Sequence, residues 1–137
     1  MTNLKNVVNN LFKPNYAKLL ENKTVVIMDD DYFFCELLKS KLEKIGAKQV
    51  LAYTDELDLL RFLNNEQVDI DYIFLDHNLK YEVGTSLFQK IKSKINNSKV
   101  VYMSSKVSKF MKISQEFDNF SFISKSHLRS SELLKVL

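Results

Sequence analysis

The chain has 137 residues, of which 45% are hydrophobic and 27% charged, with one cysteine and a net charge of +3. These values favour one globular domain, and a single cysteine excludes an internal disulfide. The sequence has neither the run of about 18 apolar residues that a transmembrane helix needs nor the apolar stretch of a signal peptide at its start. We therefore expect a cytoplasmic protein that does not bind membranes.

Residues 1–22 predict a helical extension ahead of the main domain. Apolar residues recur there at helical spacing, at Leu4, Val7, Val8, Leu11 and Phe12, and Pro14 ends the pattern. Such an apolar stripe must be covered. It either packs back on the domain or pairs with a partner chain, so a homodimer is one of two open alternatives.

Residues 23–137 alternate between short apolar runs and helical patterns. The predicted strands cover 25–28, 49–53, 72–75, 100–103 and 120–123. Helical patterns follow at 31–45, from Leu57 to Leu63, from Gly84 to about residue 95, at 107–117 and from Leu133 onward. This alternation predicts an α/β fold with a doubly wound, five-stranded parallel sheet in the flavodoxin-like order 2-1-3-4-5.

Polar residues stand at the ends of four predicted strands. They are Asp29, Asp30 and Asp31 after the first strand, Asp76 after the third, Ser104 after the fourth and Lys125 near the end of the fifth. The first and third strands are neighbours in this order, so their acids should meet at the carboxyl edge of the sheet. Crowded carboxylates repel one another, and Mg²⁺ prefers such oxygen ligands. A lysine and a hydroxyl beside them would neutralise the oxygens of a phosphoryl group that a carboxylate attacks.

Each of these residues also has a purely structural explanation. We interpret Asp31 first as a helix cap, and a serine or lysine after a strand is usually a turn or solvated residue. Cys35 falls in a helical pattern and is interpreted as a buried apolar residue. The combination of acids, hydroxyl and lysine in this order is what indicates a site.

Charge is divided unevenly along the chain. Residues 1–87 carry a net charge of −4 and residues 88–137 one of +7. The basic half is either a solvated lysine-rich face or a docking surface for an acidic partner. No DNA-reading motif accompanies it, so we expect no nucleic-acid partner.

The sequence from residue 23 to 137 resembles the receiver domains of two-component response regulators. The resemblance is carried by residues 25–31 (VVIMDDD), 73–79 (IFLDHNL), Gly84, 103–105 (MSS) and 122–125 (FISK). Gly84 lies eight residues beyond Asp76, which is the spacing of the family.

The resemblance implies a role for each matching residue. Asp76 would be the phosphoacceptor, and Asp29, Asp30, Asp76 and the backbone carbonyl of Asn78 would hold Mg²⁺. Ser104 and Lys125 would contact the phosphoryl group, and Phe122 would be the aromatic switch residue. Receivers of this kind take phosphate from a histidine kinase or a phosphotransfer protein.

Three positions depart from the family pattern. Ser126 replaces the proline that usually follows the lysine in a cis bond, Lys80 replaces a proline, and Ser104 stands where threonine is frequent. A cis bond before Ser126 would cost about 3 kcal/mol. A trans bond would allow Lys125 to point away from the acids.

The leading hypothesis is a receiver that is phosphorylated on Asp76 and signals through protein contacts, with no activity on external substrates. The alternative is a receiver-like interaction module that does not switch. That module would dimerise or dock through its N-terminal helix or its basic C-terminal half. A hydrolase that uses Asp76 as nucleophile would need a second acid two residues on, where the chain has Asn78.

Overall fold

A computed structural model describes residues 19–104 and 120–137. Its centre is one all-parallel sheet in the order β2-β1-β3-β4-β5, which confirms the predicted topology. The strands are β1 (Thr24–Met28), β2 (Gln49–Tyr53), β3 (Tyr72–Asp76), β4 (Lys99–Ser104) and β5 (Phe120–Ser124). The helices predicted within residues 1–18 and at 107–117 lie outside the described residues.

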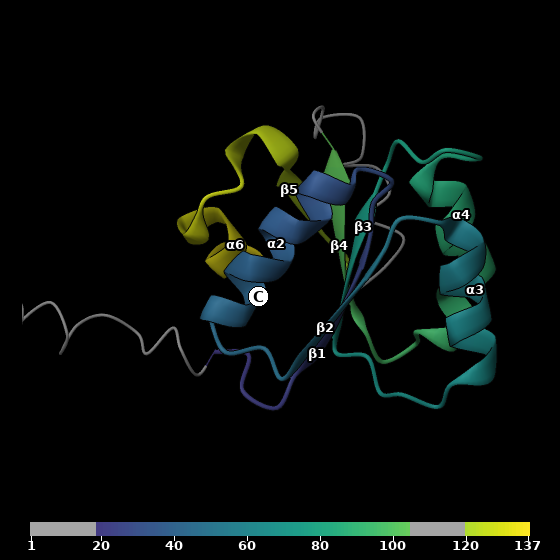
Figure 1. Ribbon diagram of the computed structural model, residues 1–137, viewed down its shortest axis with the longest axis horizontal. Helices are drawn as coiled ribbons and strands as arrows, with labels where there is room; N and C mark the ends of the chain where they lie inside the picture. The colour runs from purple at the N-terminus through teal and green to yellow at the C-terminus, as the bar shows by residue number, and fades with distance from the viewer. Residues whose placement is uncertain (1–18, 105–119) are drawn as a thin grey trace, which may run out of the picture.

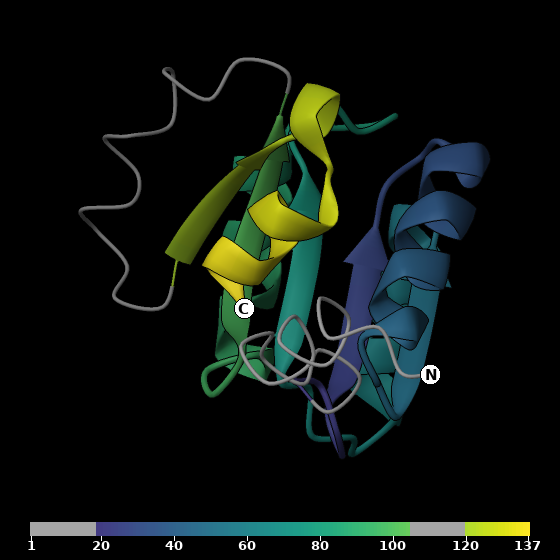
Figure 2. The ribbon, with the colours of Figure 1, turned by 90° about the vertical axis from the view of Figure 1, so that its left-hand side faces the viewer.

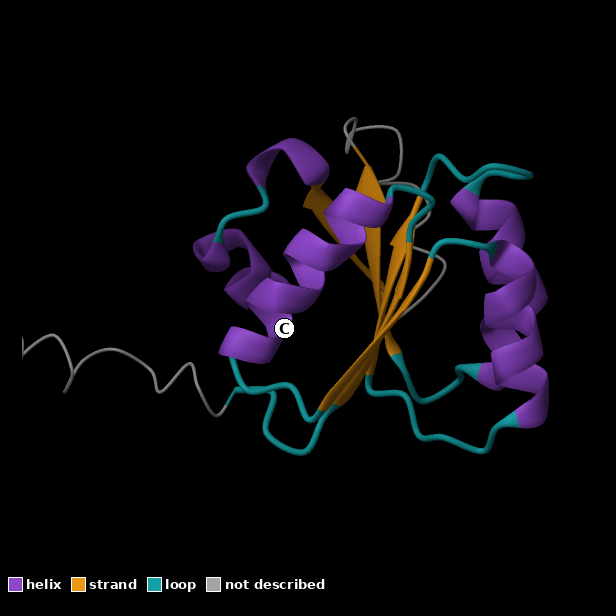
Figure 3. Ribbon diagram, in the orientation of Figure 1, coloured by secondary structure: helices purple, strands orange, loops and turns teal. Residues whose placement is uncertain are grey.

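Helices cover both faces of the sheet (Figures 1 and 3). On one face lie α2 (Tyr32–Lys44) and α6 (Ser130–Val136), and on the other lie α3 (Glu56–Asn65) and α4 (Gly84–Ile91). Figure 2 looks onto the first face, where α2 lies against β1 and β2 and α6 lies on the β5 side. Within residues 19–104 and 120–137, no helix combines the length and apolar character needed to cross a bilayer.

The central strands are apolar because both of their faces are buried. Every residue of β1 is buried. Successive side chains of a strand point to opposite faces, so Val25 and Ile27 join the core beneath α2 and α6, and Val26 and Met28 join the core beneath α3 and α4. The continuous apolar runs of the sequence are thus explained by a sheet with two core layers.

Aspartates begin the first two helices that follow strands. Asp31 caps α2 by accepting a hydrogen bond from the Phe34 N–H at 3.2 Å, which confirms its interpretation as a cap. Asp55 caps α3 through the Leu57 N–H at 2.8 Å. Both helices therefore start directly after the sheet edge that carries the acids.

The helix predicted from Gly84 to about residue 95 is shorter than expected. The α-helix ends at Ile91 and continues as a 3₁₀ turn, η2 (Lys92–Lys94). The Ile95 N–H bonds to the Lys92 carbonyl, and the Ser98 N–H bonds to the Ile95 carbonyl. The tighter hydrogen bonding turns the chain toward β4, with Ile95 buried at the corner.

Leu20, near the described end of the N-terminal segment, belongs to the core. Leu20 is fully buried in the cluster beneath α2, and its N–H donates to the Ile45 carbonyl at 3.1 Å. The proposed division of the chain after residue 22 thus assigns Leu20, a core residue, to the extension.

Candidate functional site

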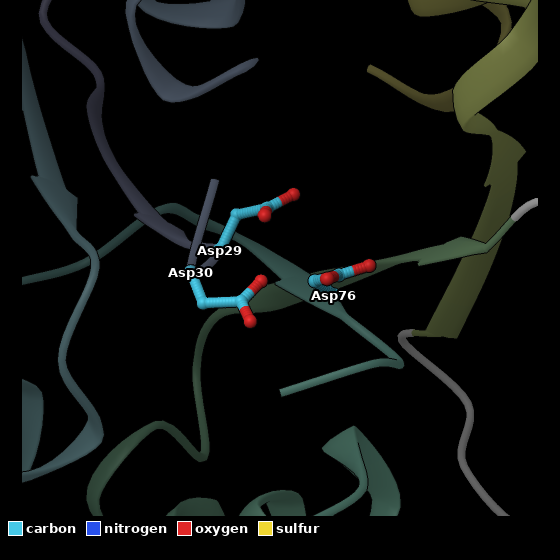
Figure 4. Close-up of side chains that lie close together, drawn as sticks. All are labelled: Asp29, Asp30 and Asp76. Carbon is cyan, nitrogen blue, oxygen red and sulfur yellow. The ribbon is translucent and has the colours of Figure 1, made fainter. Parts of the chain in front are cut away.

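Three carboxyl groups meet at the carboxyl edge of the sheet (Figure 4). Asp29 and Asp30 follow β1, and Asp76 is the last residue of β3, the strand paired with β1. One carboxylate oxygen of each lies within 4.8 Å of the others. Asp29 and Asp76 are buried and Asp30 is exposed. The strand order therefore brings together the acids that the sequence predicted to meet.

Lys125 enters the same cluster from the end of β5. Its Nζ lies 2.7 Å from Asp29 Oδ2 and 3.4 Å from Asp76 Oδ1. None of the described peptide bonds is cis, so the bond to Ser126 is trans. The lysine nevertheless points into the site, and the 3₁₀ turn η4 (Lys125–His127) carries the chain onward. A trans bond at this position therefore does not turn Lys125 away.

Burial governs how the charged groups titrate. Burial, together with the negative charge of Asp29, raises the pKa of Asp76 to about 6, although Lys125 opposes the shift. Burial likewise raises the pKa of Asp29 despite hydrogen bonds from Lys125 and from the Asp31 N–H. Burial would lower the pKa of Lys125, but Asp29 and Asp76 raise it overall.

This donor set fits a hard divalent cation. Within the part of the chain that the structure describes, three carboxylates face one ammonium, so these groups carry a net negative charge when all are ionised. The available donors are oxygens, and Asp30 opens to solvent, which leaves room for the waters that Mg²⁺ retains. Asp29, Asp30 and Asp76 are thus the side chains that could hold such an ion.

The loop after Asp76 is fixed by backbone contacts. Asn78 pairs with Val83 in an isolated antiparallel bridge, and the Gly84 N–H donates to the His77 carbonyl at 2.8 Å. A Cβ atom on Gly84 would collide with the Asp76 carbonyl oxygen and lie 2.9 Å from the Tyr102 hydroxyl. The glycine eight residues beyond Asp76 is thus required by the close approach of α4 to the end of β3.

Ser104 and Phe122 occupy different surroundings. Ser104 is the buried last residue of β4 and lies opposite Ser124 of β5, at the edge that carries the acids. Phe122 is partly buried on the α3 and α4 side of the sheet. Its ring meets those of Tyr102 and Phe120 edge to face, at centroid distances of 6.1 and 5.2 Å. Phe122 thus belongs to an aromatic cluster beneath the site.

A sequence model described as "Response regulator receiver domain" matches residues 25–137. The chain belongs to this family. This receiver is similar in fold to the receiver domain of the histidine kinase CKI1 from Arabidopsis thaliana, crystallised with Mg²⁺ and BeF₃⁻. The two share 18% identity over 90% of this chain and 95% of that one, with a TM-score of 0.69.

Receivers from other organisms resemble it to the same degree. A CheY-like receiver from Methylobacillus flagellatus shares 22% identity over 83% of this chain and 94% of its own, with a TM-score of 0.69. One from Methanospirillum hungatei shares 23% identity over 82% and 88%, with a TM-score of 0.69. No curated protein matches the chain. At these identities the structural likeness supports the fold alone.

Two contacts in this receiver were not predicted from the sequence. His77 Nδ1 and the Tyr102 hydroxyl lie 2.6 Å apart, and burial raises the pKa of Tyr102 to about 12. The ring centroid of Phe34 lies 4.3 Å from Lys125 Nζ. In the sequence, Tyr102 and Phe34 stand out only as members of apolar patterns. The one available signal was the hydroxyl of Tyr102, since a buried tyrosine usually needs a polar partner.

Cys35 is buried, as predicted, and its thiol donates to the Asp29 carbonyl at 3.2 Å. Burial, with the charges of Asp29 and Asp31, raises the pKa of this thiol to about 12. The thiol therefore stays protonated at neutral pH, and its role here is to tie α2 to the end of β1.

Proposed function

We propose that this receiver accepts a phosphoryl group on Asp76, with Mg²⁺ held by Asp29, Asp30, Asp76 and the backbone carbonyl of Asn78. The main support for this proposal is the meeting of three carboxylates, with one oxygen of each within 4.8 Å of the others. The Lys125 Nζ lies 3.4 Å from Asp76 Oδ1. The CKI1 receiver was crystallised with Mg²⁺, and the oxygen donors of this chain suit the same ion.

The transfer would proceed by direct attack. An oxygen of the Asp76 carboxylate forms a bond to phosphorus while the bond between phosphorus and the donor breaks, and the donor keeps the bonding electrons. Bound Mg²⁺ supplies positive charge to the phosphoryl oxygens. Lys125 pairs with another oxygen, and the Ser104 hydroxyl donates to a third. The phosphoryl donor would be a histidine kinase or a phosphotransfer protein.

Signalling would follow from movement of Ser104 and Phe122. Ser104 would move toward the phosphoryl group, and the Phe122 ring would turn inward beside Tyr102, which it already contacts. Such a switch shifts the populations of two conformations of the β4–β5 side. The changed surface would then bind a protein partner.

The test is Mg²⁺-dependent phosphorylation of the full chain. We expect incubation with a small acyl phosphate and Mg²⁺ to add one phosphoryl group by intact mass, and chelation of the metal to abolish the addition. Asp76→Ala should remove the modification. Asp58→Ala should keep it, because Asp58 is an exposed acid on α3 that pairs with Arg61. Absence of Mg²⁺-dependent addition to the natural chain would reject the proposal and favour the module that does not switch.

A further inference from the structure

The ammonium group of Lys125 has a third neighbour besides the two acids. Phe34, in the first turn of α2, places its ring centroid 4.3 Å from Nζ, within the range of a cation–π contact. Asp29 and Asp76 lie 2.7 and 3.4 Å from the same nitrogen. The side chain of Lys125 is only 24% exposed, so water competes weakly with these contacts.

The position of the Phe34 ring is itself fixed. The Phe34 N–H donates to the capping carboxylate of Asp31, and the ring packs, partly buried, against the core cluster beneath α2. The next residue, Cys35, bonds to the Asp29 carbonyl. The first turn of α2 is therefore tied to Asp29 by a hydrogen bond, and the ring and the acid approach the lysine from neighbouring, linked parts of the chain.

The backbone beside Lys125 offers less restraint. Residue 126 is a serine in a trans linkage, so no proline ring limits the chain there. Ser124 Oγ and Ser126 Oγ lie 2.7 Å apart and are exposed. An exposed hydroxyl pair contributes little fixed geometry. Contacts of the side chain must then hold the long, flexible lysine in one orientation.

We propose that Phe34 is a positioning residue, whose ring holds the Lys125 ammonium over the acids and so strengthens the binding of a phosphoryl group. This inference rests on the proposed function, because it concerns the lysine that would pair with a phosphoryl oxygen. In the proposed arrangement the ring contacts the lysine and not the metal ion, so its effect should fall on the phosphoryl group rather than on Mg²⁺.

The test is a fluorination series at position 34 of the full chain. Added fluorine withdraws charge from the ring face and weakens a cation–π contact while largely keeping the shape of the ring. With saturating Mg²⁺, we expect the affinity for BeF₃⁻ to fall stepwise from phenylalanine to its monofluoro, difluoro and trifluoro forms, by about three- to tenfold in total. The affinity for Mg²⁺ alone should stay within about twofold across the series.

Ordinary substitutions supply the matched controls. Phe34→Tyr should keep the BeF₃⁻ affinity and Phe34→Leu should lower it about as far as trifluorination. The same fluorination at Phe33 should change nothing, because that side chain is 82% exposed and its ring meets Tyr32. If the BeF₃⁻ affinity stayed the same across the fluorinated forms at position 34, the inference would be overturned even if Phe34→Leu weakened binding. The ring would then act only by packing. Failure of the natural chain to bind BeF₃⁻ would instead overturn the proposed function and, with it, the role of Phe34.

Discussion

Asp76 carries its negative charge in an unfavourable place. It is 2% exposed and lies beside Asp29, and its pKa of about 6 stands above the ordinary value of 3.8. A folded-state pKa that is raised means that the folded protein binds this proton more tightly than the unfolded chain does. Without a bound cation, the ionised carboxylate therefore destabilises the fold by on the order of 3 kcal/mol. This destabilisation is absent at pH values below the pKa of Asp76 in the unfolded chain. It is complete at pH values above the pKa of Asp76 in the folded protein.

Removing this charge should stabilise the metal-free receiver. We expect Asp76→Asn to raise the free energy of unfolding at about pH 7.5, and the gain to shrink as the pH falls through about 6 toward about 4. Urea unfolding in the presence of a chelator, at several pH values, measures the difference. Asp58→Asn, which changes an exposed acid, should show no such pH-dependent gain. A less stable Asp76→Asn variant at neutral pH would contradict the assigned cause of the pKa shift.

The apolar runs of the sequence located the strands well. Predicted and observed strands differ by one residue at most at either end, because a strand buried on both faces must be apolar throughout. The end of α4 was predicted less well, since the 3₁₀ turn after Ile91 depends on how the chain must enter β4. Helical periodicity carries no information about that requirement.

Some features of the candidate site could likewise be predicted from the sequence, and others could not. The meeting of Asp29 with Asp76 could be predicted because it follows from strand order alone. The direction of Lys125 could not, since it depends on the conformation of the turn at Ser126. The ring of Phe34 beside Lys125, and the contact of His77 with Tyr102, depend on how helix and loop pack against the sheet. Sequence spacing does not set those orientations.

The junction of β3 and α4 should tolerate no side chain at Gly84. We expect Gly84→Ala to lower the free energy of unfolding by about 1–3 kcal/mol, because the added Cβ would force apart the Asp76 carbonyl and the start of α4. It should also weaken Mg²⁺ binding through the displaced loop. Gln89→Ala, at an exposed position of the same helix, should change stability by less than about 0.5 kcal/mol. Urea unfolding and a Mg²⁺ titration compare the two variants. If Gly84→Ala changed stability and Mg²⁺ affinity no more than Gln89→Ala does, the close approach of α4 to β3 would be contradicted.

The packed core of the receiver begins before β1. Leu20 packs beneath α2, and its backbone N–H bonds to the end of that helix, although the sequence placed it in the predicted extension of residues 1–22. Periodicity separates elements but does not report which residue of a connecting segment is buried.

The two neighbouring leucines provide a direct comparison. We expect Leu20→Ala to reduce the free energy of unfolding by about 2–5 kcal/mol, since it leaves a cavity in the core. Leu19→Ala should cost far less, because Leu19 is 42% exposed whereas Leu20 is fully buried. Thermal or urea unfolding of the full chain measures both. A loss for Leu20→Ala as small as that expected for Leu19→Ala would instead place Leu20 outside the core.

The exposure of Asp30 beside two buried acids has a consequence for kinetics. Among the described residues, Asp30 offers a solvent-facing side along which a cation could arrive and leave. Along this route, exchange would be timed by how slowly Mg²⁺ sheds its own water. The receiver could then take up the ion without first meeting a phosphodonor.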